Sequence, residues 1–277
     1  MAYTNFIPTV WATGIERELE RLHVFAEDTN RKYEGDVKHK GDSVKILGVG
    51  KPTISTTNDK NINLDGAEDI EDTSVIMPID QIAYFNYKVD DIDKAMSKEN
   101  GIMEALSAET SEGLADVMDK YIANLAKAKE AVFDSAEAYQ ITEANILTKI
   151  DSALEVLYAN DVKPNSNITI TVSPKFYMML KRAYSDLDTN NSEMLKNGRV
   201  GKYGGATIKM SNNVAKNAEG GDLIQVKTDR AIAFANPLVH TEPYRPENGF
   251  SDAVKGFILY GSKIVRPKEL VVMNVKY

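Results

Sequence analysis

The sequence predicts a mixed α+β fold, and three observations carry this prediction. Three stretches between residues 44 and 89 have the apolar and polar alternation that is typical of strands. Residues 101–133 instead place apolar side chains at steps of three and four, which indicates a helix. Residues 142–277 then alternate short helical and strand-like stretches, which favours helices packed against a sheet.

The N-terminal segment predicts an amphipathic helix that begins near Pro8, since proline suits the first turn of a helix. Trp11, Ile15, Leu19 and Leu22 follow at i, i+4, i+8 and i+11 and form one apolar stripe. Such a helix either packs on the core of its own chain or docks on a neighbouring subunit.

Residues 44–47 and 75–77 are expected to form a long hairpin with a polar tip, roughly Thr56 to Thr73. The tip holds few large apolar residues, so we expect the hairpin to lean on another chain. Between Lys60 and Lys88 there is no lysine or arginine, whereas the stretch contains Asp65, Glu68, Asp69, Glu71, Asp72 and Asp80. This is either a solvated acidic loop or a contact with a basic partner.

The helix over residues 101–133 would be about 50 Å long at 1.5 Å per residue, so it is expected to act as a spine. A second helix is predicted from Thr142, as its N-cap, to Tyr158. A strand is predicted over 167–172, followed by a helix that starts at Ser173-Pro174. A loop over 185–205 is followed by strands near 206–210, 223–227 and 232–235. The end of the chain, over 256–275, is predicted to be β-rich with an interruption at Val265-Arg266-Pro267.

Composition excludes several classes of protein. The 277 residues include 33 Lys+Arg and 41 Asp+Glu, for a formal charge of −8, and this balance argues against a tight grip on nucleic acid. The absence of cysteine excludes disulfides, a thiol nucleophile and thiolate metal ligands. His23, His39 and His240 are not at helical ligand spacing, which argues against a multi-histidine metal centre. We expect neither a signal peptide nor a transmembrane segment.

No catalytic template fits the sequence. Gly48-Val49-Gly50 is followed by Lys51-Pro52 instead of the third glycine of a dinucleotide fingerprint. Gly261-Ser262 lacks the flanking glycine of a nucleophile elbow. The stretch from Asn61 to Asp72 places oxygen ligands like a calcium loop, but Glu68 stands at its apolar position. We therefore expect no enzymatic activity, no cofactor and no metal.

Four motifs, taken in order, carry a resemblance to a known family. They are Phe6-Ile7-Pro8 with Trp11, Asn30–Gly35 with Gly41–Ile46, Val89–Ala95, and Tyr260–Pro267. In their order and spacing the chain resembles the major capsid proteins of tailed bacteriophages, which have the Hong Kong 97-type shell fold. The resemblance implies an N-terminal arm (1–32), an extended β-hairpin loop (33–90), a peripheral domain with the spine helix (91–141 and 246–277) and an α/β axial domain (142–245).

The resemblance also implies a function. The chain would be a structural subunit that self-assembles into hexamers and pentamers of an icosahedral shell around phage double-stranded DNA. It would meet DNA only by weak, non-specific contact, have no membrane contact, and work with a separate scaffolding protein, a portal and decoration proteins. Its location would be the virion capsid, assembled in the bacterial host cytoplasm. Candidate inter-subunit contacts are Trp11, Lys45, Lys51, Asp65, Glu68, Asp69, Glu71, Asp72, Arg199 and Arg266.

Two alternatives remain open at this point. One is an encapsulin-like nanocompartment shell, which has the same fold but encloses an enzyme cargo. The other is a soluble two-domain enzyme that uses the acidic loop or the glycine-rich residues 198–205.

Overall fold

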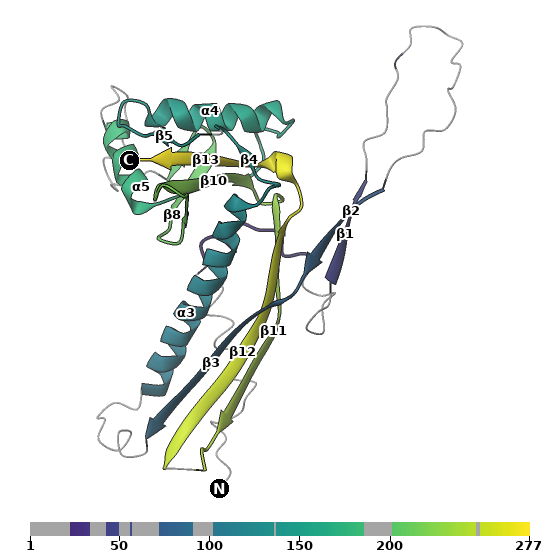
Figure 1. Cartoon of the computed structure of the whole chain (residues 1–277), viewed down its shortest axis with the longest axis vertical. Helices are drawn as coiled ribbons and strands as arrows, with labels where there is room; N and C mark the ends of the chain where they lie inside the picture. Colours follow the sequence, from purple (N-terminus) through teal and green to yellow (C-terminus); the bar gives the residue numbers. More distant parts are fainter. Residues whose placement is uncertain are drawn as a thin grey trace.

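The computed structural model describes residues 23–33, 43–49, 56, 72–90, 102–135, 137–185, 201–247 and 250–277. The predicted helix from Pro8 to Leu22 and most of the predicted acidic tip lie outside these residues. Figure 1 shows a compact lobe, an elongated lobe and a two-stranded ribbon that projects from the junction between the lobes.

The elongated lobe is a long antiparallel sheet with one helix along it (Figure 1). In the described residues this sheet has three strands in the order β11 (Ile232–Tyr244), β12 (Ser251–Ile264) and β3 (Gln81–Asp90). Side chains of β3 alternate as predicted, since Ala83 and Val89 are buried while Tyr84 is exposed. The buried face packs against the long helix α3 (Ile102–Asn124).

The predicted spine helix exists, but its predicted end at Phe133 is wrong. α3 stops at Asn124 and continues only as the 3₁₀ turn η2 (Leu125–Lys127), after which Ala128 is extended. Val132–Phe133 then form strand β4, which pairs in parallel with β13. At 1.5 Å per residue, α3 is about 35 Å long. The residues expected at its end instead pair with β13, a strand more than 130 residues further along the chain.

Strand β11 is longer than predicted. It begins at Ile232, as expected, but runs to Tyr244 with a shift of register between Ala235 and Leu238. Pro237 lies in this irregularity, and proline has no N–H to donate to a strand ladder. The proline thus interrupts the pairing without ending the strand.

The compact lobe is built on a mixed sheet. In the described part of the chain it has eight strands, with the main order β4-β13-β10-β6-β8-β7. Strand β5 pairs with β13, and β9 pairs with β10. The members not yet bounded are β5 (Tyr139–Gln140), β6 (Ile168–Val172), β7 (Lys202–Tyr203), β8 (Ala206–Met210), β9 (Ala215–Lys216), β10 (Asp222–Thr228) and β13 (Leu270–Lys276).

Both faces of this sheet are covered. Along β13, Leu270 and Val272 belong to the core shared with α3. Val271 and Met273 point the other way, into the core beneath helices α4 (Ile146–Ala159) and α5 (Pro174–Ser185). A strand with two buried faces reads as a continuous apolar run, which is the pattern of this segment.

Local sequence signals predicted the start of α5 correctly but placed the start of α4 too early. α5 begins at Pro174, as predicted, and the Phe176 N–H donates to Ser173 Oγ at 3.3 Å. α4 begins at Ile146, one turn after the predicted cap Thr142. Thr142 still makes cap contacts in the turn before the helix, because its carbonyl oxygen accepts the Ile146 N–H at 3.1 Å and its own N–H donates to Asn145 Oδ1 at 2.8 Å.

The ribbon is the predicted hairpin. Strands β1 (Ser43–Val49) and β2 (Asp72–Pro78) pair antiparallel along their whole length. Its described base leans on its own chain, whereas the sequence led us to expect that the hairpin leans on another chain. Val44, Ile46 and Met77 are buried in a cluster with Ala233, Ala235 and Leu259 of the elongated lobe.

The predicted break after β12 is confirmed, since Pro267–Glu269 form the 3₁₀ turn η3 before β13. Residues 186–200 of the predicted loop lie outside the described residues, and Lys202–Tyr203 form a short strand where loop was expected. At η3 the chain crosses from one lobe to the other, because β12 belongs to the elongated lobe and β13 to the compact lobe.

Candidate assembly surfaces

The described part of the chain shows neither a cluster of metal ligands nor a membrane-spanning helix. It contains no group of three histidine, aspartate or glutamate side chains that could hold a metal ion. Among the helices described, none combines the length and the apolar character needed to cross a membrane.

Titratable groups with shifted pKa values serve as structural ties. Burial disfavours ionisation of Asp222, but hydrogen bonds from Lys216, Ser173 and Tyr277 hold its pKa below the ordinary value. Burial and this carboxylate together raise the pKa of Tyr277. Tyr277 Oη donates to Asp222 and lies 2.9 Å from Ser173 Oγ. This network ties β13 to β10 and to the start of α5.

Two buried polar side chains join the segment 23–33 to both lobes. Asp119 of α3 accepts the backbone N–H groups of Val24, Phe25 and Ala26 at 2.7, 3.2 and 3.3 Å. Lys227 of β10, whose side chain is fully buried, donates to the carbonyl oxygens of Phe25 and Asp28. We call Asp119 and Lys227 the clasp. Burial lowers the pKa of Lys227 to about 8.

A surface ion pair and a backbone bond extend the clasp. Lys209 of β8 lies 2.7 Å from Glu27 Oε2 and 2.8 Å from Asp28 Oδ2. Asn30 then donates its N–H to the Ile232 carbonyl oxygen at 2.9 Å, beside β11. The segment 23–33 is therefore held in a fixed position between the lobes.

Only three of the predicted contact residues fall on described positions. Lys45 is exposed on β1 and lies opposite Ile76, which is also exposed. Asp72 is the first residue of β2, opposite Val49. Arg266 precedes η3 and pairs with Glu269 at 2.7 Å. The predicted contacts outside the described residues are Trp11, Lys51, Asp65, Glu68, Asp69, Glu71 and Arg199.

The predictions from sequence missed an aromatic row on the elongated lobe, in which a half-buried Phe257 lies between the exposed Tyr84 and His240. Tyr84 of β3 stands opposite Phe257 of β12, which stands opposite His240 of β11. Tyr84 is 82% exposed, and the His240 and Phe257 rings lie 5.5 Å apart. The alternation of β3 already placed Tyr84 with the polar Asn86 and Lys88, so the signal for this surface was present.

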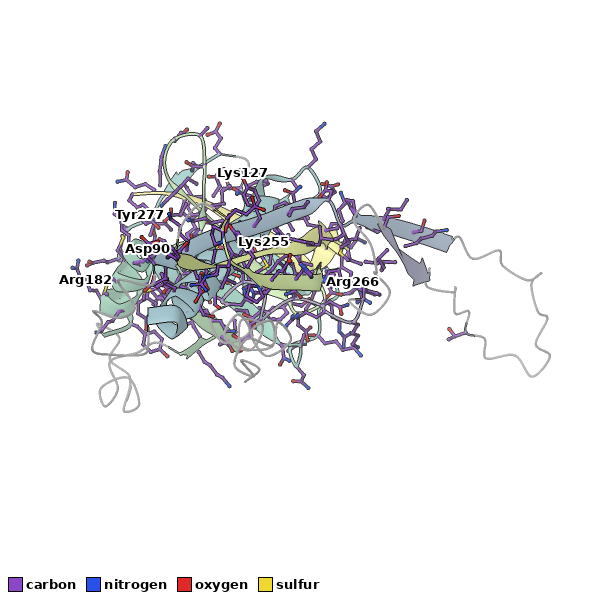
Figure 2. The ribbon with its side chains drawn as sticks, turned by 90° about the horizontal axis from the view of Figure 1, so that it is seen from below. Asp90, Lys127, Arg182, Lys255, Arg266 and Tyr277 are labelled. Carbon is purple, nitrogen blue, oxygen red and sulfur yellow. The ribbon has the colours of Figure 1, made fainter. Side chains whose placement is uncertain are left out.

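Other large apolar side chains are exposed and are candidates for contact surfaces. Met178 of α5 is 52% exposed and Phe250 is 83% exposed. Helical spacing could have found Met178, because the buried Phe176 and Leu180 lie on the opposite side of the helix. Figure 2 shows the charged side chains spread over the whole body, with Arg182 at its outer edge.

Comparison with solved structures identifies the fold. A chain of Mycobacterium phage Che8 shares 26% identity with this chain, covers 91% of each chain and has a TM-score of 0.72. The capsid of the cyanophage P-SCSP1u shares 17% identity over 92% of this chain and 86% of its own, with a TM-score of 0.69. The virus-like particle from Pyrococcus furiosus shares 11% identity over 96% and 98%, with a TM-score of 0.59. No protein-family model and no curated protein matches the sequence.

The chain therefore has the fold of bacteriophage capsid proteins, which confirms the predicted α+β class. The same similarities support the resemblance to tailed-phage major capsid proteins and the function of a major capsid subunit that forms a shell.

Proposed function

We propose that this chain is a major capsid subunit that builds an icosahedral shell of hexamers and pentamers around phage double-stranded DNA. The observation that supports this most is the match to the Che8 chain over 91% of both chains. The fold also has a ribbon, β1 and β2, that extends away from the body (Figure 1). A subunit that covers a surface needs such extensions to overlap its neighbours.

The chain's role is structural, and its charged and apolar surface residues serve as contacts between subunits. In our proposal the acidic stretch of Asp65, Glu68, Asp69, Glu71 and Asp72 meets a basic surface of a neighbour. Lys45, Lys51, Arg199 and Arg266 are proposed as contact residues of the opposite sign, and Trp11 as an apolar anchor. The arm (1–32), extended loop (33–90), peripheral domain (91–141 and 246–277) and axial domain (142–245) remain our proposed division.

Strand pairing suggests one refinement of this division. β11 of the proposed axial domain pairs with β12 of the peripheral sheet, whereas β13 pairs with β10 of the axial sheet. The proposed domain boundaries therefore do not coincide with the lobes, since β11 lies in the elongated lobe with β12, and β13 lies in the compact lobe with β10. The proposed partners are a separate scaffolding protein, a portal and decoration proteins. We also propose that contact with DNA is weak and that the shell is assembled in the host cytoplasm.

Electron microscopy of the purified protein, alone and co-expressed with its scaffolding protein, tests the proposal. We expect closed shells, or rings of six and five subunits that convert to shells. A chain that stays monomeric under both conditions would overturn the proposal.

An encapsulin-like compartment is the second candidate, and the match to the Pyrococcus furiosus particle over 96% of this chain favours it. The contents of purified particles distinguish the two. Double-stranded DNA and a portal support the phage capsid, whereas a packaged enzyme supports the compartment.

A further inference from the structure

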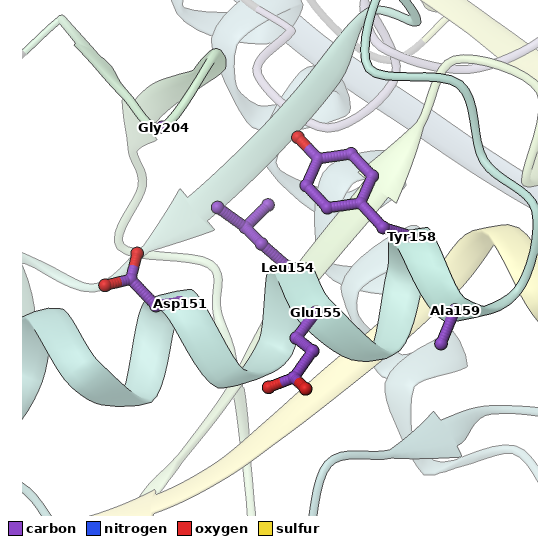
Figure 3. Close-up of a pocket in the computed structure, with 6 residues that line it drawn as sticks. All are labelled: Asp151, Leu154, Glu155, Tyr158, Ala159 and Gly204. Atoms are coloured by element: carbon purple, nitrogen blue, oxygen red, sulfur yellow. The ribbon is translucent and has the colours of Figure 1, made fainter.

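The compact lobe has an open depression beside α4. It has a volume of about 530 Å³ and is lined by Asp151, Leu154, Glu155, Tyr158, Ala159 and Gly204. Figure 3 shows Asp151, Leu154 and Tyr158 on the part of α4 that lies beside Gly204. Asp151, Glu155 and Tyr158 stand at i, i+4 and i+7, so they share one face of the helix. We call these six residues the α4 depression.

The floor of the depression is a close contact between two elements. Gly204 has a φ of +56°, and a Cβ there would lie 3.0 Å from Leu154 Cδ1. The glycine therefore lets the turn between β7 and β8 approach α4 while leaving the depression open. Its lining is mainly apolar, and two exposed carboxylates stand at its rim.

The rim carboxylates remain accessible to a partner. Asp151 accepts one hydrogen bond, from Tyr203 Oη at 3.2 Å, which leaves its other oxygen atom available. Glu155 makes no ion pair with any residue that the structure describes, and it is exposed. An apolar floor with an anionic rim suits an apolar side chain that is flanked by lysine or arginine.

The outer face of α5 carries that chemistry. Met178 is 52% exposed, and Lys175, Lys181 and Arg182 surround it at i−3, i+3 and i+4. Helix α5 contains no acidic residue. Phe176, Leu180 and Ala183 are buried in the core, so the face with Met178 is directed away from the lobe.

The two surfaces cannot meet within one chain. α4 and α5 contribute to the same core, which fixes them relative to each other. Arg182 also pairs with Glu143, just before α4, at 3.0 Å. In a ring, however, every subunit presents two different surfaces to its two neighbours, and these surfaces must be complementary.

We propose that Met178 and the basic side chains around it on α5 of one subunit dock into the α4 depression of the next subunit in a ring. Met178 fills the apolar floor, and Lys175 and Lys181 face Asp151 and Glu155. This inference rests on the proposed function, because it requires that the chain form rings. It assigns to the compact lobe a head-to-tail contact between copies of the chain.

Charge reversal on each surface tests the contact. The first variant carries Asp151→Lys and Glu155→Lys, and the second carries Lys175→Glu and Lys181→Glu. Each alone places like charges opposite each other, so we expect native mass spectrometry to show at least a tenfold loss of rings. The chain that carries all four substitutions is complementary to itself, and we expect it to form rings again.

Mixing the two variants gives a sharper result. In an equal mixture each variant is complementary only to the other, so subunits must alternate around the ring. Rings of six close under this rule and rings of five do not. We therefore expect hexamers without pentamers, and Met178→Ala in the wild-type background should weaken association about tenfold.

A matched control reverses two carboxylates elsewhere, with Glu109→Lys and Glu112→Lys on the exposed face of α3. It should form rings as the wild type does, and circular dichroism should show that every variant is folded. The inference is overturned if either single-surface variant forms rings as the wild type does, or if the fourfold variant fails to form rings again. It is also overturned if the control loses rings to the same extent as the single-surface variants. If the α4 variant instead loses only co-assembly with the scaffolding protein, the depression binds that partner and the inference is wrong. If the wild type forms neither rings nor shells, the proposed function itself fails.

Discussion

Asp119 and Lys227 hold opposite ends of the same turn of chain. The Asp119 carboxylate accepts the N–H groups of residues 24–26, and the Lys227 ammonium donates to the carbonyl oxygens of Phe25 and Asp28. One residue comes from the long helix and the other from the sheet of the compact lobe. The clasp therefore joins both lobes through a segment that belongs to neither sheet, and four predictions follow from it and from the packing of the ribbon.

Replacing Lys227 by methionine should destabilise the protein. Lys227→Met keeps the apolar stem but leaves the carbonyl oxygens of Phe25 and Asp28 without this donor, at a cost of about 2 kcal/mol. Urea unfolding followed by circular dichroism measures this change. Lys120→Met is the control, because the side chains of Lys120 and its partner Asp116 are 56% and 41% exposed, so its removal should cost less. Equal stability of the Lys227 variant and the wild type would contradict the role of the clasp.

The contribution of Lys227 to stability should depend on pH. Burial lowers its pKa to about 8 in the folded protein, from 10.5 for an ordinary lysine. Between these values the unfolded chain binds more protons than the folded chain, so the free energy of unfolding should rise with pH from about 8 to 10.5. The measurement is the difference in unfolding free energy between the wild type and Lys227→Met at several pH values. A difference that stays constant or falls across this window would contradict the assignment.

Replacing Asp119 by asparagine should loosen the segment 23–33. The amide keeps one acceptor oxygen, but its NH₂ group faces N–H donors that the carboxylate accepted, which should cost about 1 to 3 kcal/mol. Hydrogen exchange by mass spectrometry should show faster exchange at Val24, Phe25 and Ala26. Asp116→Asn is the matched control, because Asp116 pairs with Lys120 on the surface of the same helix. Unchanged exchange at all three amides would show that other contacts hold the segment.

A methyl group at Gly261 should disturb the base of the ribbon. A Cβ there would lie 2.3 Å from the Pro78 carbonyl oxygen, which is backbone and cannot move without shifting β2. We expect Gly261→Ala to lower the midpoint of thermal unfolding, with a loss of about 1 to 3 kcal/mol. Gly113→Ala in α3 meets no atom within 4 Å and should instead raise stability slightly, because alanine favours a helix. A change of unfolding midpoint in the same direction for both variants would contradict this account.

Local signals predicted much of the fold because they act over a few residues. Ser173 and Pro174 start α5 through a cap that lies within four residues. The alternation of Ala83 and Tyr84 in β3 separates a buried from an exposed face. The end of α3 could not be predicted in this way, because Val132 leaves the helical pattern only to pair with Val271. For the same reason the burial of the ribbon base on Ala233 and Leu259 was not expected.

The sequence by itself determined the element types, the absence of cysteine chemistry and the order of parts that resembles the capsid fold, since these depend on composition and short-range periodicity. Only the tertiary structure decided which residues anchor the chain. Asp119 reads in sequence as one of the polar residues of an amphipathic helix, and Lys227 as a charge at the end of a strand. Packing buries both beside backbone groups about 95 and 200 residues away, and a buried charge persists only where such partners satisfy it. Met178 and the α4 depression likewise become complementary only once folding has placed them on different faces of one rigid lobe.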